Sequence, residues 1–522
     1  MTNHHHPSPQ VKATRALVIG GGIAGLIAAR VLSDYYDQVQ IVERDLLLEQ
    51  PNLRAGTPQA FHIHRVVGRG QSCLDRLFPN FTSELIERGA VSTKNKKVQV
   101  VNFAGHFIVP AEEEASVSRA LREWTIRQRV QAISNVSFST GLDVVGLNRD
   151  AEHTRITGVH VRQRGQMEQP SLLEADLVID ASGYSTKLTQ WLQALGYDVP
   201  EPERLTSDIG YSSRYYKVSP QFAQEWAGIR IAGQPSLGIR TANGHILSDN
   251  TWGIIFFGAA GHYPSTDPDK FDQQLRQITG PQLADMLQTE AEPITPIRGF
   301  RVAECILQNF DQMANWPAGL LVIGDAFCRL DPIYAHGISV AALQAEMLAT
   351  HLKEQQRNPQ RDFELRVLKS MREAAQPAWW LDAIIDLSWA GVTYSGQEPP
   401  KAVTLLQRYL ELYIQEATKN MIGYLKQESS DENTPPPPPD PFSIQPSILS
   451  YVLVIDLVLS PNVIFNAITY RLLLDVEAKQ EGPHLLQNIT EQYKSSLEKI
   501  LNEVIPHFSL PFMSQPADAV AD

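Results

Sequence analysis

Residues 16–25 read ALVIGGGIAG, an apolar run that ends directly in a glycine-rich turn. Small and apolar residues follow at helical spacing over residues 23–34, and a second apolar run, residues 39–42, ends in Glu43 and Arg44. Strand, glycine turn, helix and strand in this order form one βαβ unit, which requires a parallel sheet. The stretch therefore predicts an α/β fold with a Rossmann-like nucleotide-binding domain.

The three glycines of the turn have the spacing GxGxxG in the context that gives this motif meaning. Gly20 permits the tight turn, Gly22 lets the backbone approach a pyrophosphate, and Gly25 allows the helix to pack closely on the strand. The free N–H groups at the start of the helix, around Ile23 and Ala24, offer partial positive charge to phosphates. The motif predicts a dinucleotide site.

Glu43 closes the second strand of the unit, 18 residues after Gly25. A carboxylate near this spacing accepts hydrogen bonds from a ribose diol, and it would repel a ribose phosphate. NADP is therefore disfavoured at this site, while FAD and NAD both remain open on this unit alone.

A second signature lies about 300 residues further on, where residues 320–337 read LLVIGDAFCRLDPIYAHG. The apolar run ends in Gly324–Asp325, and a carboxylate at the end of a parallel strand suits ribityl or phosphate-side hydroxyls. Pro332 would fix the chain near a flavin ring, and Gly337 would let backbone N–H groups face that ring. Asp325 as a simple helix cap is the alternative. A ligand that reaches both signatures must be long, which favours FAD.

These motifs, together with Asp180–Gly183, resemble the three FAD motifs of the class A flavoprotein monooxygenases. Residues 54–64 (RAGTPQAFHIH) and 456–465 (DLVLSPNVIF) resemble a branch with polyether-type epoxidases and related hydroxylases. The resemblance implies that Glu43 holds the adenosine ribose, that Arg119 approaches the pyrophosphate or ribityl region, and that Asp325 holds ribityl hydroxyls. The candidate cofactor-binding residues are Gly20, Gly22, Ile23, Ala24, Gly25, Glu43, Arg44, Arg54, Arg119, Asp180, Gly183, Gly324, Asp325, Pro332, Gly337 and Ile338.

The resemblance implies an FAD-dependent monooxygenase that inserts one oxygen atom from O2 into a hydrophobic substrate through a flavin hydroperoxide. Epoxidation and hydroxylation both remain open. The flavin carries the chemistry, and His336 is a candidate to donate a hydrogen bond to flavin or substrate, or simply to cap its helix. NAD(P)H is expected to reduce the flavin directly or through a partner reductase. A halogenase, a reductase of isoprenoid double bonds and a non-catalytic flavin-binding protein are the alternatives.

Residues 205–300 are rich in aromatic and β-branched residues with Asn-Gly turns, which predicts a mainly antiparallel sheet inserted into the first domain. This sheet would form the floor of the substrate pocket, and helices of the C-terminal region, including Trp379, Trp380 and residues 448–472, could close it. The pocket candidates are Tyr211, Tyr215, Trp252 and Phe256, and Phe257 belongs to the same predicted aromatic wall.

The expected organisation has seven parts. They are a disordered leader (1–14), the FAD-binding domain (15–204), the inserted β-sheet substrate domain (205–300), the return of the FAD-binding domain (301–360), C-terminal helices (361–427), an acidic and Pro-rich linker (428–447) and a helical tail (448–522).

Composition limits the partners. The net charge is −13 without a Lys/Arg-dense stripe, which disfavours nucleic acid. Three separated cysteines without a CxxC motif fit a reducing, cytoplasmic location and disfavour zinc.

Two features leave alternatives open. His62 and His64 lie near the flavin or bond locally, because a metal pair would need a third ligand. The apolar residues 448–465 are interrupted by Asp456 and Pro461, so packing in the core or on a membrane surface is expected rather than a membrane span.

Overall fold

The computed structural model describes residues 14–233, 241–279, 289, 291–397, 399–430, 440–480, 484–493 and 497–506. The expected leader therefore lies almost entirely outside the described residues, and so do residues 431–439 of the expected linker. The first three residues of that linker, 428–430, are the last residues of a helix.

A five-stranded, all-parallel sheet forms the centre of the nucleotide-binding half, as the glycine stretch predicts. Its strand order is β20 (Leu320–Val322), β11 (Leu177–Asp180), β1 (Arg15–Ile19), β2 (Gln38–Glu43) and β7 (Val136–Thr140). Strands β1 and β20 are separated by about 300 residues but lie two positions apart in this sheet. The sheet therefore brings the two predicted FAD signatures to the same edge.

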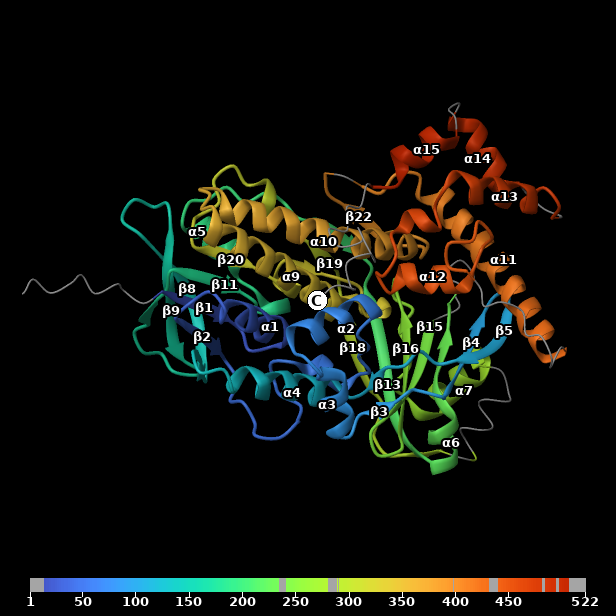
Figure 1. The fold of residues 1–522 in the computed structure, drawn as a ribbon, viewed down its shortest axis with the longest axis horizontal. Coiled ribbons are helices and arrows are strands. Elements are labelled where there is room, and N and C mark those ends of the chain that lie inside the picture. Colours follow the sequence, from blue (N-terminus) through green and yellow to red (C-terminus); the bar gives the residue numbers. More distant parts are fainter. Residues whose placement is uncertain are drawn as a thin grey trace, which may run out of the picture.

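Helix α1 (Ile23–Leu32) follows β1 directly, and eight of its ten residues are buried. It packs against α9 (His336–Arg357), which in turn packs along α10 (Phe363–Asp386). Figure 1 shows these three helices beside the parallel sheet, in the half of the molecule that contains β1 and β2. Further helices of this half are α2 (Gly68–Leu77), α3 (Phe81–Glu87), α4 (Arg119–Gln131) and α5 (Leu188–Ala194).

The second half contains an eight-stranded, mostly antiparallel sheet. Two of its strands, β4 and β5, come from residues 97–110, so this sheet extends beyond the predicted insertion. Its strands are β17 (Ala291–Pro293), β13 (Ile209–Val218), β16 (Thr251–Gly258), β15 (Thr241–Leu247), β14 (Trp226–Ile231), β4 (Lys97–Asn102) and β5 (Gly105–Pro110), with β18 (Arg298–Val302) beside β13.

This large sheet buries apolar side chains on both faces. One face joins the main core of the molecule, and the other forms a separate core with helices α6 (Pro220–Glu225) and α7 (Pro268–Thr279). Because side chains alternate along a strand, neighbouring residues of β16 contribute to different cores.

Smaller sheets complete the fold. They are β10–β9–β8 (Ser171–Glu174, Ile156–Gln163 and Leu142–Arg149), β21–β19–β12–β22 (Cys328–Arg329, Cys305–Leu307, Glu203–Thr206 and Thr393–Ser395) and β3–β6 (Val91–Ser92 and Ala115–Ser116).

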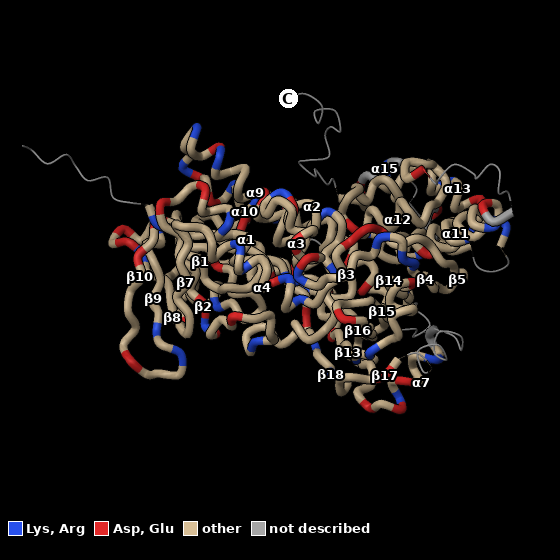
Figure 2. The backbone as a smooth tube through the Cα atoms, turned by 60° about the horizontal axis from the view of Figure 1, so that its bottom comes forward, with Lys and Arg blue, Asp and Glu red and all other residues tan. Residues whose placement is uncertain are grey.

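A helical lobe at the C-terminal end lies over the large sheet, where α11 contacts β5 (Figure 1). It contains α11 (Val403–Ser430), α12 (Ile448–Ile455), α13 (Ala467–Glu477), α14 (Leu485–Tyr493) and α15 (Leu497–Val504). Among the described helices, none combines the length and apolar character needed to cross a membrane. Basic and acidic residues are interspersed along the chain in both halves (Figure 2).

Candidate flavin-binding cleft

A single cleft of about 580 Å³ runs between the parallel sheet and the large antiparallel sheet. Its lining includes both glycine-rich signatures and residues of β13, β16 and β18. The predicted site residues that line it are Gly20, Gly22, Ile23, Ala24, Glu43, Arg44, Arg54, Arg119, Gly183, Gly324, Asp325, Pro332, Gly337, Ile338 and Tyr211.

The nucleotide end of the cleft is organised around Glu43, at the end of β2. Its carboxylate accepts hydrogen bonds from the backbone N–H groups of Gly21 (2.6 Å) and Asp45 (2.9 Å). These contacts hold the carboxylate against the glycine turn, at the edge of the sheet where parallel α/β folds bind ligands. Glu43 is therefore fixed in position before any ribose arrives.

Arg54 lies behind Glu43 and is surrounded by carboxylates. Its guanidinium is 3.4 Å from Glu43, 3.0 Å from Asp45 and 2.8 Å from Glu123. Burial alone would lower the pKa of Arg54, but the Glu123 and Glu43 charges outweigh it and raise that pKa. Arg54 therefore has two roles: it lines the cleft, and its ion pair helps to orient the Glu43 carboxylate.

The middle of the cleft fits a diphosphate. An added Cβ at Gly22 would meet nothing closer than Arg54 Nη2, at 3.7 Å, so the turn leaves open space over the start of α1. Arg119 Nε is buried at the cleft without a hydrogen-bond partner among the described residues. An unpartnered buried donor of this kind indicates a ligand that accepts from it.

The other end of the cleft is formed by the second signature. Asp325 opens into the cleft, and no described residue donates a hydrogen bond to its side chain. Desolvation by the cleft walls raises the pKa of Asp325, although the charges of Arg119 and Arg329 oppose this. Its carboxyl group can thus accept hydrogen bonds from a ligand in the cleft.

Two predicted cofactor-site residues do not line the cleft. Gly25 packs α1 against Gly20, as its role in the motif requires. Asp180 was expected to contact the cofactor, but its fully buried carboxyl group accepts from Ser182 N (2.9 Å) and Thr186 Oγ1 (2.6 Å). Asp180 therefore shapes the local turn.

The prediction that His336 could reach flavin or substrate is wrong. Its ring is fully buried, with Nδ1 3.0 Å from Asp382 Oδ1 and Nε2 2.7 Å from the Ile455 carbonyl oxygen. Burial alone would lower its pKa, but Asp382 raises the pKa of His336 above its usual value. Both ring nitrogens are occupied away from the cleft.

The substrate face also differs from the prediction. Tyr211 lines the cleft with Phe257 and Phe300, whereas Trp252 and Phe256 point to the opposite face of the large sheet. The strand alternation of β16 places residues 252 and 256 together and residue 257 on the other side.

Tyr215 shares the strand face of Tyr211 but lies beyond the cleft. Its hydroxyl donates to the Phe61 carbonyl oxygen, and its ring contacts the Phe61 ring edge to face.

His62 and His64 both line the cleft beside this aromatic wall. His62 Nδ1 is 2.8 Å from Ser213 Oγ, and His64 Nδ1 is 2.9 Å from the His62 carbonyl oxygen. Burial and nearby arginines lower the pKa of His62 to about 4 and that of His64 to about 3. Both imidazoles are therefore neutral near pH 7 and act as uncharged hydrogen-bonding groups.

The neutral state of His62 predicts acid sensitivity. Because the unfolded chain binds the proton near pH 6.5 and the folded chain only near pH 4, stability is lost as the pH falls through this window. Lowering the pH from 7 to 5 should cost about 2 kcal/mol through this residue. Urea unfolding at both pH values should show that His62→Gln is less acid-sensitive than the wild type by about this amount. Equal acid sensitivity would contradict the assignment.

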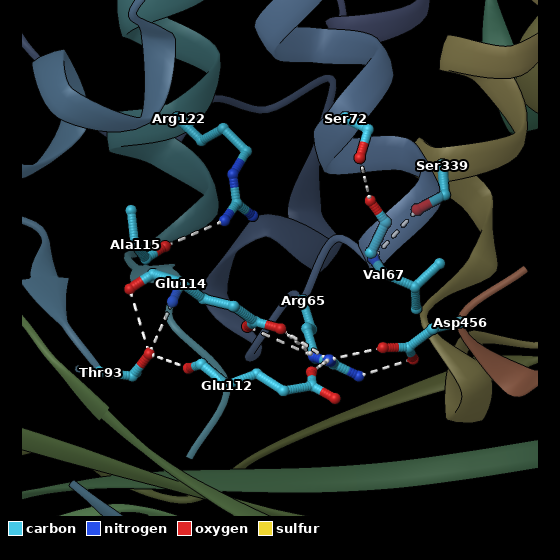
Figure 3. A network of polar contacts seen from close by, with 11 residues as sticks. Arg65, Val67, Ser72, Thr93, Glu112, Glu114, Ala115, Arg122, Ser339 and Asp456 are labelled. Atoms are coloured by element: carbon cyan, nitrogen blue, oxygen red, sulfur yellow. Dashed lines mark hydrogen bonds and ion pairs between the residues drawn. The ribbon is translucent and has the colours of Figure 1, made fainter. Parts of the chain in front are cut away.

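The segment after the histidines is held by a charge network shown in Figure 3. The Arg65 guanidinium lies between Glu112 (3.0 Å), Glu114 (2.6 Å) and Asp456 (2.9 Å), the last of these in the C-terminal lobe. The three carboxylates are close enough together to hold a cation. Here the positive charge between them is the Arg65 guanidinium. No described residue beyond Ala341 lines the cleft, so the predicted closure by Trp379, Trp380 and residues 448–472 is wrong. The lobe instead contacts the segment after the two histidines through the Arg65–Asp456 ion pair.

Several lining residues escape the motifs. Arg162, Trp191, Arg329 and Asp331 line the cleft, although none of them was singled out from the motifs. The Arg329 guanidinium lies 4.2 Å from the ring centre of Tyr184. Asp331 directly precedes the predicted Pro332, and this adjacency is the only feature of the sequence that could have marked Asp331 as a cleft residue.

Comparison with known proteins agrees with this geometry. A model of the family described as "FAD binding domain" matches residues 13–374. Protein Rv3254 of Mycobacterium tuberculosis is 30% identical over 391 residues, which are 72% of this chain and 81% of that protein.

Solved structures share the fold at low identity. The flavin-dependent brominase Bmp2, as a triple mutant, has a TM-score of 0.57 and 15% identity over 92% of this chain and 98% of its own. PqsL, a probable FAD-dependent monooxygenase from Pseudomonas aeruginosa, has a TM-score of 0.50 and 14% identity over 72% of this chain and 94% of its own. At this identity the likeness shows the fold alone. The family match over most of the chain, joined to a cleft that connects both FAD signatures, shows that the protein belongs to the FAD-binding, class A flavoprotein monooxygenase family and is an FAD-dependent oxidoreductase.

Proposed function

We propose that the protein transfers one oxygen atom from O2 to an uncharged, largely hydrophobic substrate, by epoxidation or hydroxylation. The observation that carries the proposal is the continuity of the cleft, which joins the FAD signatures to an aromatic wall. When bound, FAD supplies the two-electron activation of oxygen.

The residues of the chain would hold this cofactor along the length of the cleft. Glu43 would accept from the adenosine ribose, Gly22 and Arg119 would contact the diphosphate, and Asp325 would accept from the ribityl hydroxyls. The N–H groups at the start of α9, around Gly337, would stabilise negative charge near the redox end. Each role uses a group that lines the cleft.

The substrate end favours an apolar molecule with one or two neutral polar groups. Tyr211, Phe257 and Phe300 provide an aromatic surface, which suits a polyene, an isoprenoid or an aromatic ring. Neutral His62 and His64 would hydrogen-bond a hydroxyl or carbonyl group without demanding a charge. The same wall excludes water from the reaction.

The electron donor is proposed to be NAD(P)H, acting directly or through a partner flavin reductase. The described chain carries one glycine-turn dinucleotide fingerprint, at Gly20–Gly25, and this fingerprint belongs to the FAD cleft. A nicotinamide would therefore bind only transiently.

The decisive experiment uses isotopically labelled dioxygen. The purified full-length protein is loaded with FAD, supplied with NAD(P)H with and without a flavin reductase, and given a panel of polyenes, isoprenoids and phenols. Mass spectrometry should find one labelled oxygen atom in a product.

Each other outcome would overturn the proposal in a different way. A saturated product formed without oxygen would indicate a double-bond reductase, and a brominated or chlorinated product in halide buffer would indicate a halogenase. A protein that retains FAD without converting any compound, with either donor system, would favour a non-catalytic flavin-binding protein.

A further inference from the structure

A cluster of three buried carboxyl groups lies behind the redox end of the cleft. Asp331 comes from the segment before Pro332, and Asp382 and Asp386 come from successive turns of α10. All three side chains are at most 1% exposed. Asp331 also lines the cleft, whereas Asp382 and Asp386 do not.

Asp382 has a partner for its charge. Its carboxyl group is 3.0 Å from His336 Nδ1, and His336 Nε2 faces the Ile455 carbonyl oxygen, which can only accept. A histidine with an acceptor at each nitrogen is best satisfied when both nitrogens carry a proton. His336 and Asp382 thus form an ion pair with no net charge.

Asp331 and Asp386 have no such partner. Their carboxyl groups lie within hydrogen-bonding reach of each other. Asp331 Oδ1 accepts from Ile333 N (2.7 Å), and the Ser207 hydroxyl faces Asp386, but Asp331 Oδ2 and both Asp386 oxygens are buried without a well-formed hydrogen bond from a described residue. Two adjacent buried carboxylates cannot both ionise cheaply, and one added proton gives each group a hydrogen bond.

We propose that Asp331 and Asp386 share one proton, and that Asp331 delivers this proton to the cofactor-binding cleft during turnover. The delivery step depends on the proposed oxygen transfer, whereas the shared proton does not. Asp331 is the donor because it alone of the two lines the cleft, and Asp386 is a positioning residue that keeps the proton on the pair.

The proton balance of the reaction calls for one such donor. With a reduced nicotinamide as the two-electron donor, the substrate RH, O2, NAD(P)H and one proton give ROH, H2O and NAD(P)+. Asp331 would break its O–H bond to supply the proton that ends in water. The resulting pair of carboxylates would then recover a proton from water at the cleft.

The surroundings keep the proton on the pair at neutral pH. Burial raises the pKa of Asp331 to about 7 and also raises that of Asp386. The titratable and polar groups that face the pair are Asp382, His336, Tyr334, Cys305 and Ser207.

The shared proton is tested by infrared spectroscopy of the full-length protein at neutral pH, with and without FAD. Difference spectra against Asp331→Asn and Asp386→Asn should each show the loss of one carboxylic acid C=O band that shifts in D2O. Glu477→Gln is the matched control, because Glu477 is equally buried but ion-paired with Arg408 at 2.9 Å. That control should lose no acid band.

Both asparagine variants should fold, since each removes one of two competing carboxyl groups. From about pH 4 to about pH 7, the wild type should lose thermal stability relative to Asp386→Asn, because its unfolding releases the shared proton. An acid band that survives in both variants would overturn the shared proton.

Delivery to the cleft is tested by the visible absorbance of bound FAD. In the wild type this absorbance should change with pH as Asp331 ionises, and both variants should lose the transition. Retention of the transition in both would overturn the delivery. Failure to bind FAD would instead contradict the proposed function. The infrared result would still show whether Asp331 and Asp386 share a proton.

Discussion

Replacing Gly25 with alanine should lower the free energy of unfolding by about 4 kcal/mol and abolish FAD binding. An added Cβ at this position would lie 1.9 Å from the Gly20 carbonyl oxygen and 3.3 Å from Val18 Cγ1. The Gly20 backbone cannot retreat, because its N–H group donates to the Val42 carbonyl oxygen at 2.8 Å. Helix α1 would therefore have to move away from the sheet. Urea unfolding followed by circular dichroism measures the loss.

Gly423→Ala is the matched control for this substitution. Gly423 lies in helix α11, and an added Cβ there would meet no atom within 4 Å. Alanine should raise stability by up to about 1 kcal/mol at this position, because glycine is the poorer helix former. Similar losses for both variants would contradict the packing role of Gly25.

Replacing Asp325 with alanine should weaken FAD binding by roughly 100-fold, with little effect on the fold. Hydrogen bonds to a charged group contribute about 1.5–3 kcal/mol, and each 1.4 kcal/mol is a factor of ten. The Asp325 carboxyl group accepts nothing from the described residues, so its removal leaves no protein donor unpaired. Fluorescence titration of the cofactor-free protein with FAD measures the change.

Asp37→Ala is the control at the opposite edge of the same sheet. Asp37 precedes β2, is exposed, and accepts from Thr14 N at 2.7 Å. Ligands bind at the carboxyl ends of parallel strands, so this substitution should leave FAD affinity unchanged. An Asp325→Ala protein with wild-type affinity would contradict the placement of the ribityl chain.

Local sterics made the nucleotide-binding part of the fold readable from the sequence. Gly20 adopts a φ of +102°, and only glycine accepts this conformation without strain. The same applies to Gly324, with a φ of +68° and space for no Cβ beside Ala24. Because a positive φ favours glycine over other residue types, the glycines in the sequence mark these turns.

The substrate wall could not be assigned in this way. Strand alternation separates residues 252 and 256 from 257, but it does not say which set faces the cleft. Both faces of the large sheet are apolar, because α6 and α7 cover the face opposite the cleft. When both faces of a strand are apolar, its hydrophobic pattern does not show which face lines the cleft.

The sequence by itself determined the Rossmann-like fold, the choice of FAD as the cofactor and the residues that line the two ends of the cleft, since these follow from backbone sterics and short-range spacing. The tertiary structure alone decided which charged and titratable side chains lie next to each other. It joined Arg65 to Asp456 across 391 positions, turned His336 toward Asp382, and buried Asp331 against Asp386. Such charge partners depend on which elements pack together, and residue type and spacing do not encode that packing.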